Sequence, residues 1–284
     1  MRHEYRVRVG PVGFRIGSDW GAPIAALRDL YRDYPGADVP DYSVRLEATR
    51  PWRRWVRPQV RIEGDYTLPE AVPLPLAHAL LAAEMAMNLQ MALGHRRHLL
   101  LHASAVERDG RALLMSGESG AGKSTLAALL GARNWRFMGD EFALIDPANG
   151  LAHAFPRPIS LKNESVSAVA AAVPGARFGP LLTATPKGDI RHLVPDARAL
   201  AAMEMPARPA LLIFPRFGAA AAIRAVTPAE AFVRLTEAST NYVTLGEAGF
   251  TALTRLVRAV PAVAVDYPDG ESGVEAVEAL WAGL

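Results

Sequence analysis

A run of glycines followed by a lysine and a serine lies near the middle of the chain, from Gly117 to Ser124. Its order, Gly-Glu-Ser-Gly-Ala-Gly-Lys-Ser, is the complete G-x-x-x-x-G-K-S pattern of a phosphate-binding loop, or Walker A motif. Glycines let the backbone curl around phosphate oxygens, and the amides that open the following helix point into the same hollow. The pattern predicts a nucleotide site whose binding residues are Gly117, Glu118, Ser119, Gly120, Ala121, Gly122, Lys123, Ser124 and Thr125.

Two side chains of this loop have predictable roles. We expect Lys123 to reach the β- and γ-phosphates and the Ser124 hydroxyl to bind Mg²⁺. The flanking residues support this interpretation, because 112–115 is apolar like a strand and 125–130 is mostly apolar like a helix. The alternative, in which the glycines only make a turn, would have to explain eight matched positions in that context.

An acidic pair follows the loop, with Asp140 seventeen residues after Lys123 and Glu141 directly behind it. In an open α/β sheet that position lies at the strand ends beside the phosphate-binding loop. A carboxylate there can hold Mg²⁺ or accept the proton of an attacking hydroxyl. Asp140 is therefore the main catalytic candidate, although both acids could instead be solvated turn residues; on a strand, Glu141 would face the opposite way.

A histidine lies upstream of the loop in a hairpin pattern. The apolar run from Leu99 to Val106 and the run 112–115 flank an Asp-Gly turn. His102 lies in the first run, where its imidazole could reach the rim of the sheet that carries the loop. A lone histidine is more often structural or solvent-exposed, so spacing alone leaves both interpretations open.

Four basic residues lie in predicted loops after the acidic pair: Lys162, Lys187, Arg191 and Arg216. Any of them could approach a transferring phosphoryl group as its charge redistributes. Lys187 is slightly favoured because a proline and a glycine mark a turn around it. Most surface lysines and arginines have no such role.

The rest of the chain predicts a mixed α/β fold. Apolar and charged residues alternate in the first seventy positions, which indicates β-strands. We therefore divide the chain into a strand-rich N-terminal module, 1–72, and a larger domain, 73–284. Segment 51–58 interleaves arginine and tryptophan and could dock a nucleic acid or a peptide, or be a solvated edge. Later elements are two short strands within 137–146, a strand at 210–214, helices near 230–238 and 247–260, a strand at 262–266 and a terminal helix.

Composition narrows the class of protein. The 31 basic residues barely exceed the 29 acidic ones, so the overall charge does not indicate a nucleic-acid or membrane partner. The chain has no cysteine, and its first residues do not resemble a signal peptide, which favours a cytoplasmic location. The longest apolar stretch, Leu74 to Leu93, contains polar residues that a membrane span would carry only at a cost. We interpret it as a buried or half-buried helix ended by Gly94.

The chain resembles the HPr kinase/phosphorylase family, and more narrowly the HPr-kinase-related proteins called HprK-related kinase A. The resemblance covers the region from Leu99 to Arg191 and is loose elsewhere. The segments that carry it are His102-Ala103-Ser104, Gly117 to Thr125, Gly139-Asp140-Glu141, Pro156 to Asn163 and Thr185-Pro186-Lys187-Gly188.

This resemblance implies a P-loop kinase core whose fold is related to that of phosphoenolpyruvate carboxykinase, and transfer of phosphate from ATP to a serine hydroxyl on a small protein. Asp140 would be the general base, His102 would orient or tune that acid, and Lys123 would keep its loop role. Glu141 matches the second acid and would complete a Mg²⁺ site with Ser124 and Asp140.

Some residues depart from the family pattern. Thr125 replaces the glutamate after the loop serine, and Ala103 replaces the glycine after the histidine. The arginine-glycine signature segment is not recognisable, and Glu164, in about the right region, is only a guess for a third metal-binding acid. These departures argue against the reverse, phosphorolytic reaction and against HPr itself as the substrate.

We therefore expect an ATP-dependent kinase acting on a serine or threonine hydroxyl of a small protein or peptide. One alternative is a small-metabolite P-loop kinase, although 116 residues precede the loop here whereas such enzymes usually begin with it. The other is a nucleotide-binding accessory or regulatory protein without productive transfer. Related kinases often form oligomers, which makes a homo-oligomer compatible with the resemblance.

Overall fold

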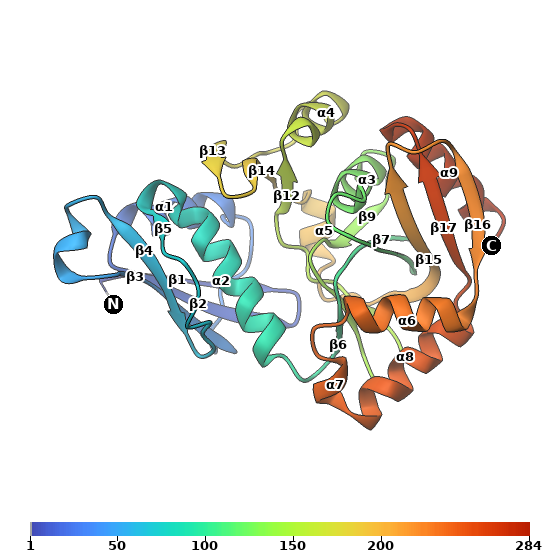
Figure 1. Cartoon of the computed structure of the whole chain (residues 1–284), viewed down its shortest axis with the longest axis horizontal. Coiled ribbons are helices and arrows are strands. Elements are labelled where there is room, and N and C mark those ends of the chain that lie inside the picture. The colour runs from blue at the N-terminus through green and yellow to red at the C-terminus, as the bar shows by residue number, and fades with distance from the viewer. Residues whose placement is uncertain (1) are drawn as a thin grey trace.

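Alternating apolar and charged residues near the N-terminus form a five-stranded sheet in the computed structural model, which describes residues 2–284 (Figure 1). Strands β2 and β3 pair in parallel, which requires a crossover, and helix α1 (Gly21–Leu30) provides it. The predicted strands are confirmed, whereas α1 was not foreseen because it has Pro23 in its first turn and no side-chain N-cap. The sheet order is β1 (His3–Val9), β2 (Val12–Ser18), β3 (Tyr42–Ala48), β4 (Gln59–Gly64) and β5 (Leu74–Pro75).

Helix α2 (Ala79–Gly94) packs on strands β3 and β4 of this sheet. It ends at Gly94 as predicted, but it begins later than Leu74. Prolines at 73 and 75 keep the first residues out of the helix, because proline donates no backbone hydrogen bond and disfavours a helical conformation in the residue before it. Those residues form β5 and a 3₁₀ turn, η2 (Leu76–His78), instead.

The α2 region is the one stretch within residues 2–284 that is long and apolar enough to cross a membrane, with a mean hydropathy of 1.2 over Leu76–Gly94. In this structure 56% of that stretch is buried inside the protein, which is what the core helix of a globular domain also shows. The finding agrees with the interpretation of the segment as a core helix.

One hydrophobic cluster joins the N-terminal sheet to part of the rest of the chain. Met87 of α2 packs in the same cluster as Phe14 of β2, and that cluster continues to Leu100, Phe142 and Phe155. The boundary between residues 72 and 73 stays a prediction, but the apolar face of α2 is buried against the module that precedes it.

A six-stranded central sheet forms the second part of the molecule. Strands β8, β15 and β17 are parallel, and β7 runs antiparallel to both of its neighbours, β8 and β9. Strands β8, β9, β15 and β17 therefore all end at the same edge. The sheet order is β16 (Ala222–Val226), β17 (Ala262–Tyr267), β15 (Arg208–Phe217), β8 (Arg111–Ser116), β7 (Ala103–Arg108) and β9 (Arg136–Gly139).

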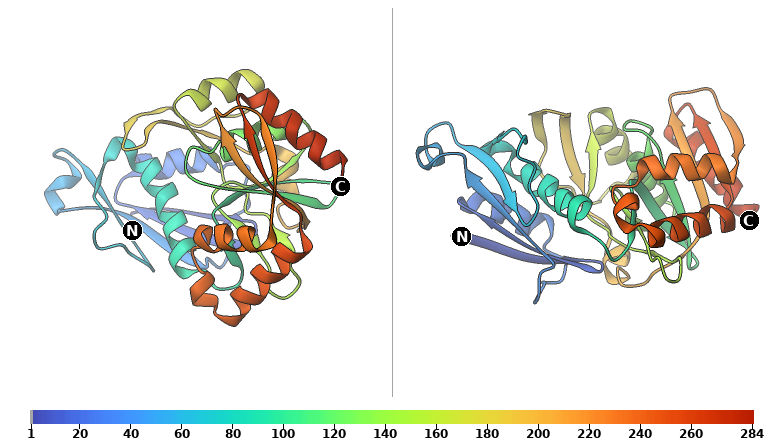
Figure 2. Two further views of the ribbon diagram at one scale, coloured as in Figure 1. Left: turned by 45° about the vertical axis from the view of Figure 1, so that its right-hand side comes forward. Right: turned by 60° about the horizontal axis from the view of Figure 1, so that its bottom comes forward.

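Helices cover both faces of the central sheet (Figure 2). On one face lie α3 (Lys123–Gly131) and α9 (Gly270–Ala282). On the other lie α6 (Pro228–Ala238), α8 (Glu247–Ala259) and the short α7 (Tyr242–Leu245). The helices predicted near 230–238, near 247–260 and at the C-terminus are thus confirmed, as is the mixed α/β class.

Two three-stranded sheets complete the fold. The first contains β6 (Leu99–Leu101), β10 (Ala143–Ile145) and β11 (Ala152–His153). The second contains β12 (Ile159–Lys162), β14 (Gly188–Leu193) and β13 (Leu182–Thr185), and lies between the N-terminal module and α3 (Figure 1). The remaining helical segments are η1 (Pro51–Arg54), α4 (Glu164–Ala172) and α5 (Ala197–Ala201).

The predicted hairpin before the loop is formed by β7 and β8, with Asp109 at φ 54° and Gly110 at φ 74° in its turn. The predicted strand from Leu99 to Val106 is wrong in one respect. It breaks at His102, because β6 pairs with β10 in a different sheet from β7.

A histidine stack lies where α2 leads into β6. His95 and His98 are buried, their rings are nearly parallel at 5.1 Å, and Nε2 of His95 lies 2.9 Å from Nδ1 of His98. Burial, followed by the charge of His98, lowers the pKa of His95 to about 3. Burial and the neighbouring His153 lower the pKa of His98 to about 4.

We expect this stack to make the protein acid-sensitive. Both imidazoles would be neutral when folded and would bind a proton in the unfolded chain below pH about 6.5, so their stabilisation is complete above that pH and is lost as pH falls toward 4. Lowering the pH from 7 to 5 should cost about 2 kcal/mol per histidine. Urea unfolding at several pH values measures this. The His95→Gln/His98→Gln double variant should have a shallower dependence than wild type, whereas a variant of the exposed His3 should not; equal slopes in the double variant and wild type would contradict the assignment.

Candidate functional site

The glycine-rich segment forms a loop between β8 and α3, as its sequence predicts. Gly120 and Gly122 have φ values of 88° and 93°, in the left-handed region that favours glycine. Gly122 also leaves no room for a side chain, since a Cβ there would lie 2.3 Å from the Tyr267 hydroxyl oxygen. The loop is thus held against the end of β17, and Phe217, at the end of β15, donates its backbone N–H to the Ala121 carbonyl oxygen at 3.3 Å.

Lys123 is the first residue of α3, and its side chain turns back over the loop. Its Nζ donates to the carbonyl oxygens of Gly117, at 2.7 Å, and Glu118, at 2.9 Å. The residue is only 7% exposed. Burial lowers the pKa of this ammonium, while the charges of Asp140 and Glu141 act in the opposite direction.

Asp140 follows β9 at the edge where β8 ends, and its side chain is buried beside the loop. The Ser104 hydroxyl donates to its Oδ1 at 2.6 Å, and the Ser124 hydroxyl of the loop lies near enough to the carboxylate to help lower its pKa. Burial and the charge of Glu141 raise the pKa of Asp140 to about 6, against the opposing effects of the two serines and Lys123. A carboxylate with that pKa can accept a proton near neutral pH.

His102 contacts the second acid of the pair. Its Nδ1 lies 3.1 Å from the Glu141 carbonyl oxygen and 3.7 Å from the Glu141 carboxylate. Because a carbonyl oxygen only accepts, Nδ1 carries the hydrogen and Nε2 is left as an acceptor. Burial lowers the pKa of His102, and Glu141 raises it in part. The hydrogen bond of His102 thus goes to Glu141 and that of Ser104 to Asp140, and the expectation that His102 orients or tunes Asp140 stays a prediction.

Ser104 has no role in the sequence-based prediction, yet it is fully buried and bonded to Asp140. Its signal is its position two residues after His102. Alternate residues of a strand share a face, so a histidine expected at the site indicates that the residue two positions later faces the same way. The Ser116 hydroxyl, which donates to the His102 carbonyl oxygen at 3.3 Å, holds the two strand ends together.

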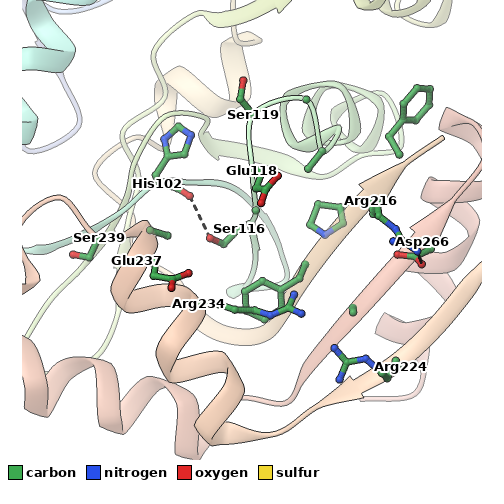
Figure 3. Close-up of a pocket in the computed structure, with 18 of the residues that line it drawn as sticks. His102, Ser116, Glu118, Ser119, Arg216, Arg224, Arg234, Glu237, Ser239 and Asp266 are labelled. Carbon is green, nitrogen blue, oxygen red and sulfur yellow. Dashed lines mark hydrogen bonds and ion pairs between the residues drawn. The ribbon is translucent and has the colours of Figure 1, made fainter. Parts of the chain in front are cut away.

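A cavity of about 1160 Å³ opens on one side of the loop (Figure 3). Seen from Glu118 and Ser119, His102 lies on one side, whereas Arg216 and Asp266 lie together on the other. The arginines of this cavity have partners, since Arg216 pairs with Asp266. Arg224 and Arg234 both pair with Glu230, the former at 2.6 Å and the latter at 2.7 Å.

A second cavity, of about 50 Å³, lies on the other side of the acidic pair. Asp140 and Glu141 line it together with Lys162 and Lys187, while α2 supplies the wall that includes Glu84, Met85 and Asn88. Buried Arg157 also lines this cavity and forms an ion pair with Glu84. The first cavity is thus lined by His102 and by the loop from Gly117 to Ala121, whereas the second is lined by the acidic pair.

The oxygen ligands at the loop fit Mg²⁺. The Ser124 hydroxyl and the Asp140 carboxylate lie near each other, and Mg²⁺ in phosphate sites takes one or two carboxylates with substrate oxygens and waters. Within residues 2–284 no group of three or more histidine, aspartate or glutamate side chains could hold a metal ion. The metal roles of Ser124, Asp140 and Glu141 stay predictions.

The other candidates are more scattered. Lys187 lies in the turn between β13 and β14, as predicted, but Lys162, Arg191 and Arg216 lie in strands rather than loops. Arg191 packs over the Phe178 ring at 4.9 Å and donates to the Gly179 carbonyl oxygen. Glu164 begins α4 and lines neither cavity.

Comparisons with known proteins give a limited result. A family described as SynChlorMet cassette protein ScmC matches residues 78–204. The chain matches no curated protein. Among solved structures it is similar to the Hpr(Ser) kinase/phosphatase from Coxiella burnetii, with 14% sequence identity and a TM-score of 0.30, over 65% of this chain and 99% of that chain. At that TM-score the likeness carries no weight for the function of this chain, so the arguments below rest on its own residues.

Proposed function

We propose that this protein is an ATP-dependent kinase that transfers the γ-phosphate to a serine or threonine hydroxyl of a small protein or peptide. One observation carries the proposal. The carboxylate of Asp140 is buried beside the serine of a phosphate-binding loop, has a raised pKa and lines a separate cavity. Nucleotide binding alone does not require a proton acceptor on the far side of the loop.

The loop supports the choice of ATP and Mg²⁺ as cofactors. Its glycine backbone, the start of α3 and the Lys123 ammonium place positive charge where phosphates would lie, and the adjoining cavity of about 1160 Å³ can hold a nucleotide. Ser124 would hold Mg²⁺ directly and Asp140 would hold it through a bound water, so that the carboxylate stays free to accept a proton; the ion would neutralise charge on the phosphates when bound. Lys123 would exchange its bonds to the loop carbonyls for phosphate oxygens.

The residues around Asp140 suit transfer to a hydroxyl. Asp140 would take the acceptor proton on its carboxylate, with Ser104 fixing the direction of that carboxylate. His102 would position Glu141 through its Nδ1 hydrogen bond. We include in this proposal a P-loop kinase core of the HPr kinase type, related to phosphoenolpyruvate carboxykinase, because His102, the loop and the acidic pair have that family's spacing.

The size of the acceptor cavity favours a side chain over a whole metabolite. Small-molecule sites occupy roughly 300–1,000 Å³, whereas the cavity that Asp140 faces measures about 50 Å³. A space of that size accepts the hydroxymethyl end of serine or threonine, with the rest of the acceptor outside. We therefore place a small-metabolite kinase second, and a nucleotide-binding accessory protein third.

Incubation with Mg²⁺ and γ-labelled ATP tests these functions. We expect label on a degenerate peptide library with a fixed central serine or threonine, and on small serine-containing proteins encoded beside this one. Label on a metabolite instead would favour the second function. Tight ATP binding with no labelled acceptor would favour the third and overturn the kinase proposal.

The cellular setting belongs to the same proposal. A cytoplasmic kinase would have Mg·ATP available, and a chain without cysteine suits a reducing compartment. Nearly balanced charge supports a protein partner and argues against nucleic acid or an anionic membrane. A homo-oligomer is compatible with this function, and light scattering would measure it.

A further inference from the structure

The lysines of this protein gather at one place. Only three of its 31 basic residues are lysines, namely Lys123, Lys162 and Lys187, and the rest are arginines. Lys123 belongs to the loop, and the other two line the cavity that contains Asp140 and Glu141. A chain that uses arginine everywhere else therefore has lysine only around its acidic pair.

The segments that carry Lys162 and Lys187 are locked together. Asn163, directly after Lys162, has φ 51°, and its Oδ1 accepts the backbone N–H of Asp189 at 3.1 Å. Gly188, directly after Lys187, has φ 85°, and a Cβ there would lie 2.2 Å from that same Oδ1. For a residue other than glycine, such as Asn163, a backbone held in this conformation costs about 1–3 kcal/mol and persists where the surroundings over-determine it. The two lysines are thus presented from a fixed support.

Both ammonium groups are available to a ligand. Within residues 2–284 neither Lys162 nor Lys187 forms an ion pair, whereas Arg157 in the same cavity is paired with Glu84. Lys162 is half-buried and lies close enough to the loop to lower the pKa of Lys123 and of His102. Lys187 is exposed at the turn between β13 and β14. Of the two lysines that line the cavity, one is therefore half-buried and the other exposed.

The part of an acceptor peptide that does not fit in this cavity would lie just outside it, near Lys187. Met85 and Asn88 of α2 line the cavity opposite the sheet of β12, β13 and β14, and η2 is joined to that sheet by the His78 ring, whose Nε2 contacts the Thr183 carbonyl oxygen at 3.0 Å. Since about 50 Å³ holds only one side chain, the residues that flank the hydroxyl would lie outside the cavity, beside α2 and the sheet of β12, β13 and β14.

We propose that Lys162 and Lys187 make the acceptor site at this cavity selective for an acidic peptide segment, in which carboxylate side chains flank the hydroxyl that receives phosphate. The inference rests on the proposed kinase function and adds the class of acceptor. Exposed complementary charge acts mainly on encounter and orientation, so the selectivity should lie in KM and should weaken with salt. Lysine suits this role because its compact charge on a flexible stem adapts to carboxylates in different positions.

Three synthetic peptides with blocked termini test the proposal. They share one serine or threonine centre taken from the labelled library and carry aspartate, asparagine or lysine at the flanking positions. We expect the aspartate peptide to have a kcat/KM about fivefold to tenfold above the asparagine peptide, the size of one or two exposed ion pairs. The lysine peptide should be poorer than either.

Variants then assign the preference to the lysines. In Lys187→Met the ratio of aspartate to asparagine peptide should fall toward one through KM, and Lys187→Arg, which keeps the charge, should retain most of it. Lys162→Met should lower the same ratio, whatever it does to kcat. Arg258→Met is the matched control, because Arg258 is exposed on α8 away from both cavities.

The outcomes separate this inference from the function on which it rests. Labelled peptides with no acidic preference, or a preference unchanged in Lys187→Met and Lys162→Met, would overturn the lysine proposal and leave the kinase function standing. No labelled peptide of any kind, with ATP bound normally, would overturn the kinase function and the acceptor class together.

Discussion

Replacing Asp140 with asparagine is expected to slow phosphoryl transfer by about a hundredfold or more while ATP binding stays close to that of wild type. The amide keeps the size of the carboxylate and offers an oxygen to the hydroxyls of Ser104 and Ser124, so the local packing should survive. What the variant loses is the proton acceptor. Single-turnover transfer and equilibrium ATP binding, measured separately, distinguish the two effects. Turnover equal to wild type would remove Asp140 from the mechanism.

The pH dependence of kcat/KM is a second test of the role of Asp140 as a base. Burial and Glu141 raise the pKa of Asp140 to about 6, and only the ionised form can act as a base. Activity should therefore rise as pH increases through about 6 and level off above it. In Ser104→Ala the loss of a hydrogen bond to the charged form should raise that pKa, which moves the acid limb to higher pH. A purely structural role for Ser104 would lower stability without moving the limb.

Two further substitutions provide comparisons for the Asp140 variant. Lys123→Ala should reduce both ATP affinity and turnover, because its ammonium would contact the phosphates in the ground state and during transfer. His102→Ala should cause an intermediate loss of turnover, since His102 contacts Glu141 and not the proposed base. If the histidine variant only melts at lower temperature, a structural role is sufficient for that residue.

Residues close in sequence made much of this site predictable. A phosphate-binding loop is a local motif, since its eight positions lie between one strand and one helix. The turn at Asp109 and Gly110 likewise predicts the β7–β8 hairpin from adjacent residues. That hairpin brings His102 to the end of the sheet where the loop begins, because Ala103 pairs with Ser116.

Contacts between distant segments could not be predicted in this way. Asp140 reaches the loop although β9 is not next to β8, since β7 lies between them and is antiparallel to both. The contact of His102 with Glu141 depends on how the chain turns after β9, for which periodicity gives no rule. The wall that α2 adds to the acceptor cavity comes from a helix fifty residues earlier in the chain, packed on another sheet.

The short strands after the acidic pair also could not be predicted from the sequence pattern. Strands β12, β13 and β14 contain two apolar positions each, too few to display a period of two above the background of turns. Their sheet forms because its buried residues, such as Leu161 and Ile159, pack under α3. Lys162 and Lys187 thus reach the site through tertiary packing that the sequence pattern does not express.

Arg157→Met is expected to lower the free energy of unfolding by about 3–5 kcal/mol, because it leaves the Glu84 carboxylate buried without its partner. Both side chains are almost fully buried, at 5% and 6% exposed, and they join α2 to the segment after β11. Arg157 also donates to the Glu84 carbonyl oxygen at 2.9 Å and to the Asn88 side chain, while the Tyr31 hydroxyl donates to Glu84 Oε1 at 2.8 Å. For a chain of this size the midpoint of thermal unfolding should fall by roughly 10 °C.

A set of variants separates the effect of the buried charge on the stability of the fold from the effect of the packing around it. The Glu84→Gln/Arg157→Met double variant should be more stable than Arg157→Met alone, since it removes the uncompensated carboxylate. Arg133→Met breaks the exposed pair with Glu271 and should leave the midpoint nearly unchanged. Because the shared core joins the two parts of the chain, wild type should unfold in one transition in calorimetry. If Arg157→Met unfolded at the same temperature as wild type, the Glu84 carboxylate would have to find another partner. The ion pair between Arg157 and Glu84 would then not be what stabilises the wall of the cavity between α2 and the sheet of β12, β13 and β14.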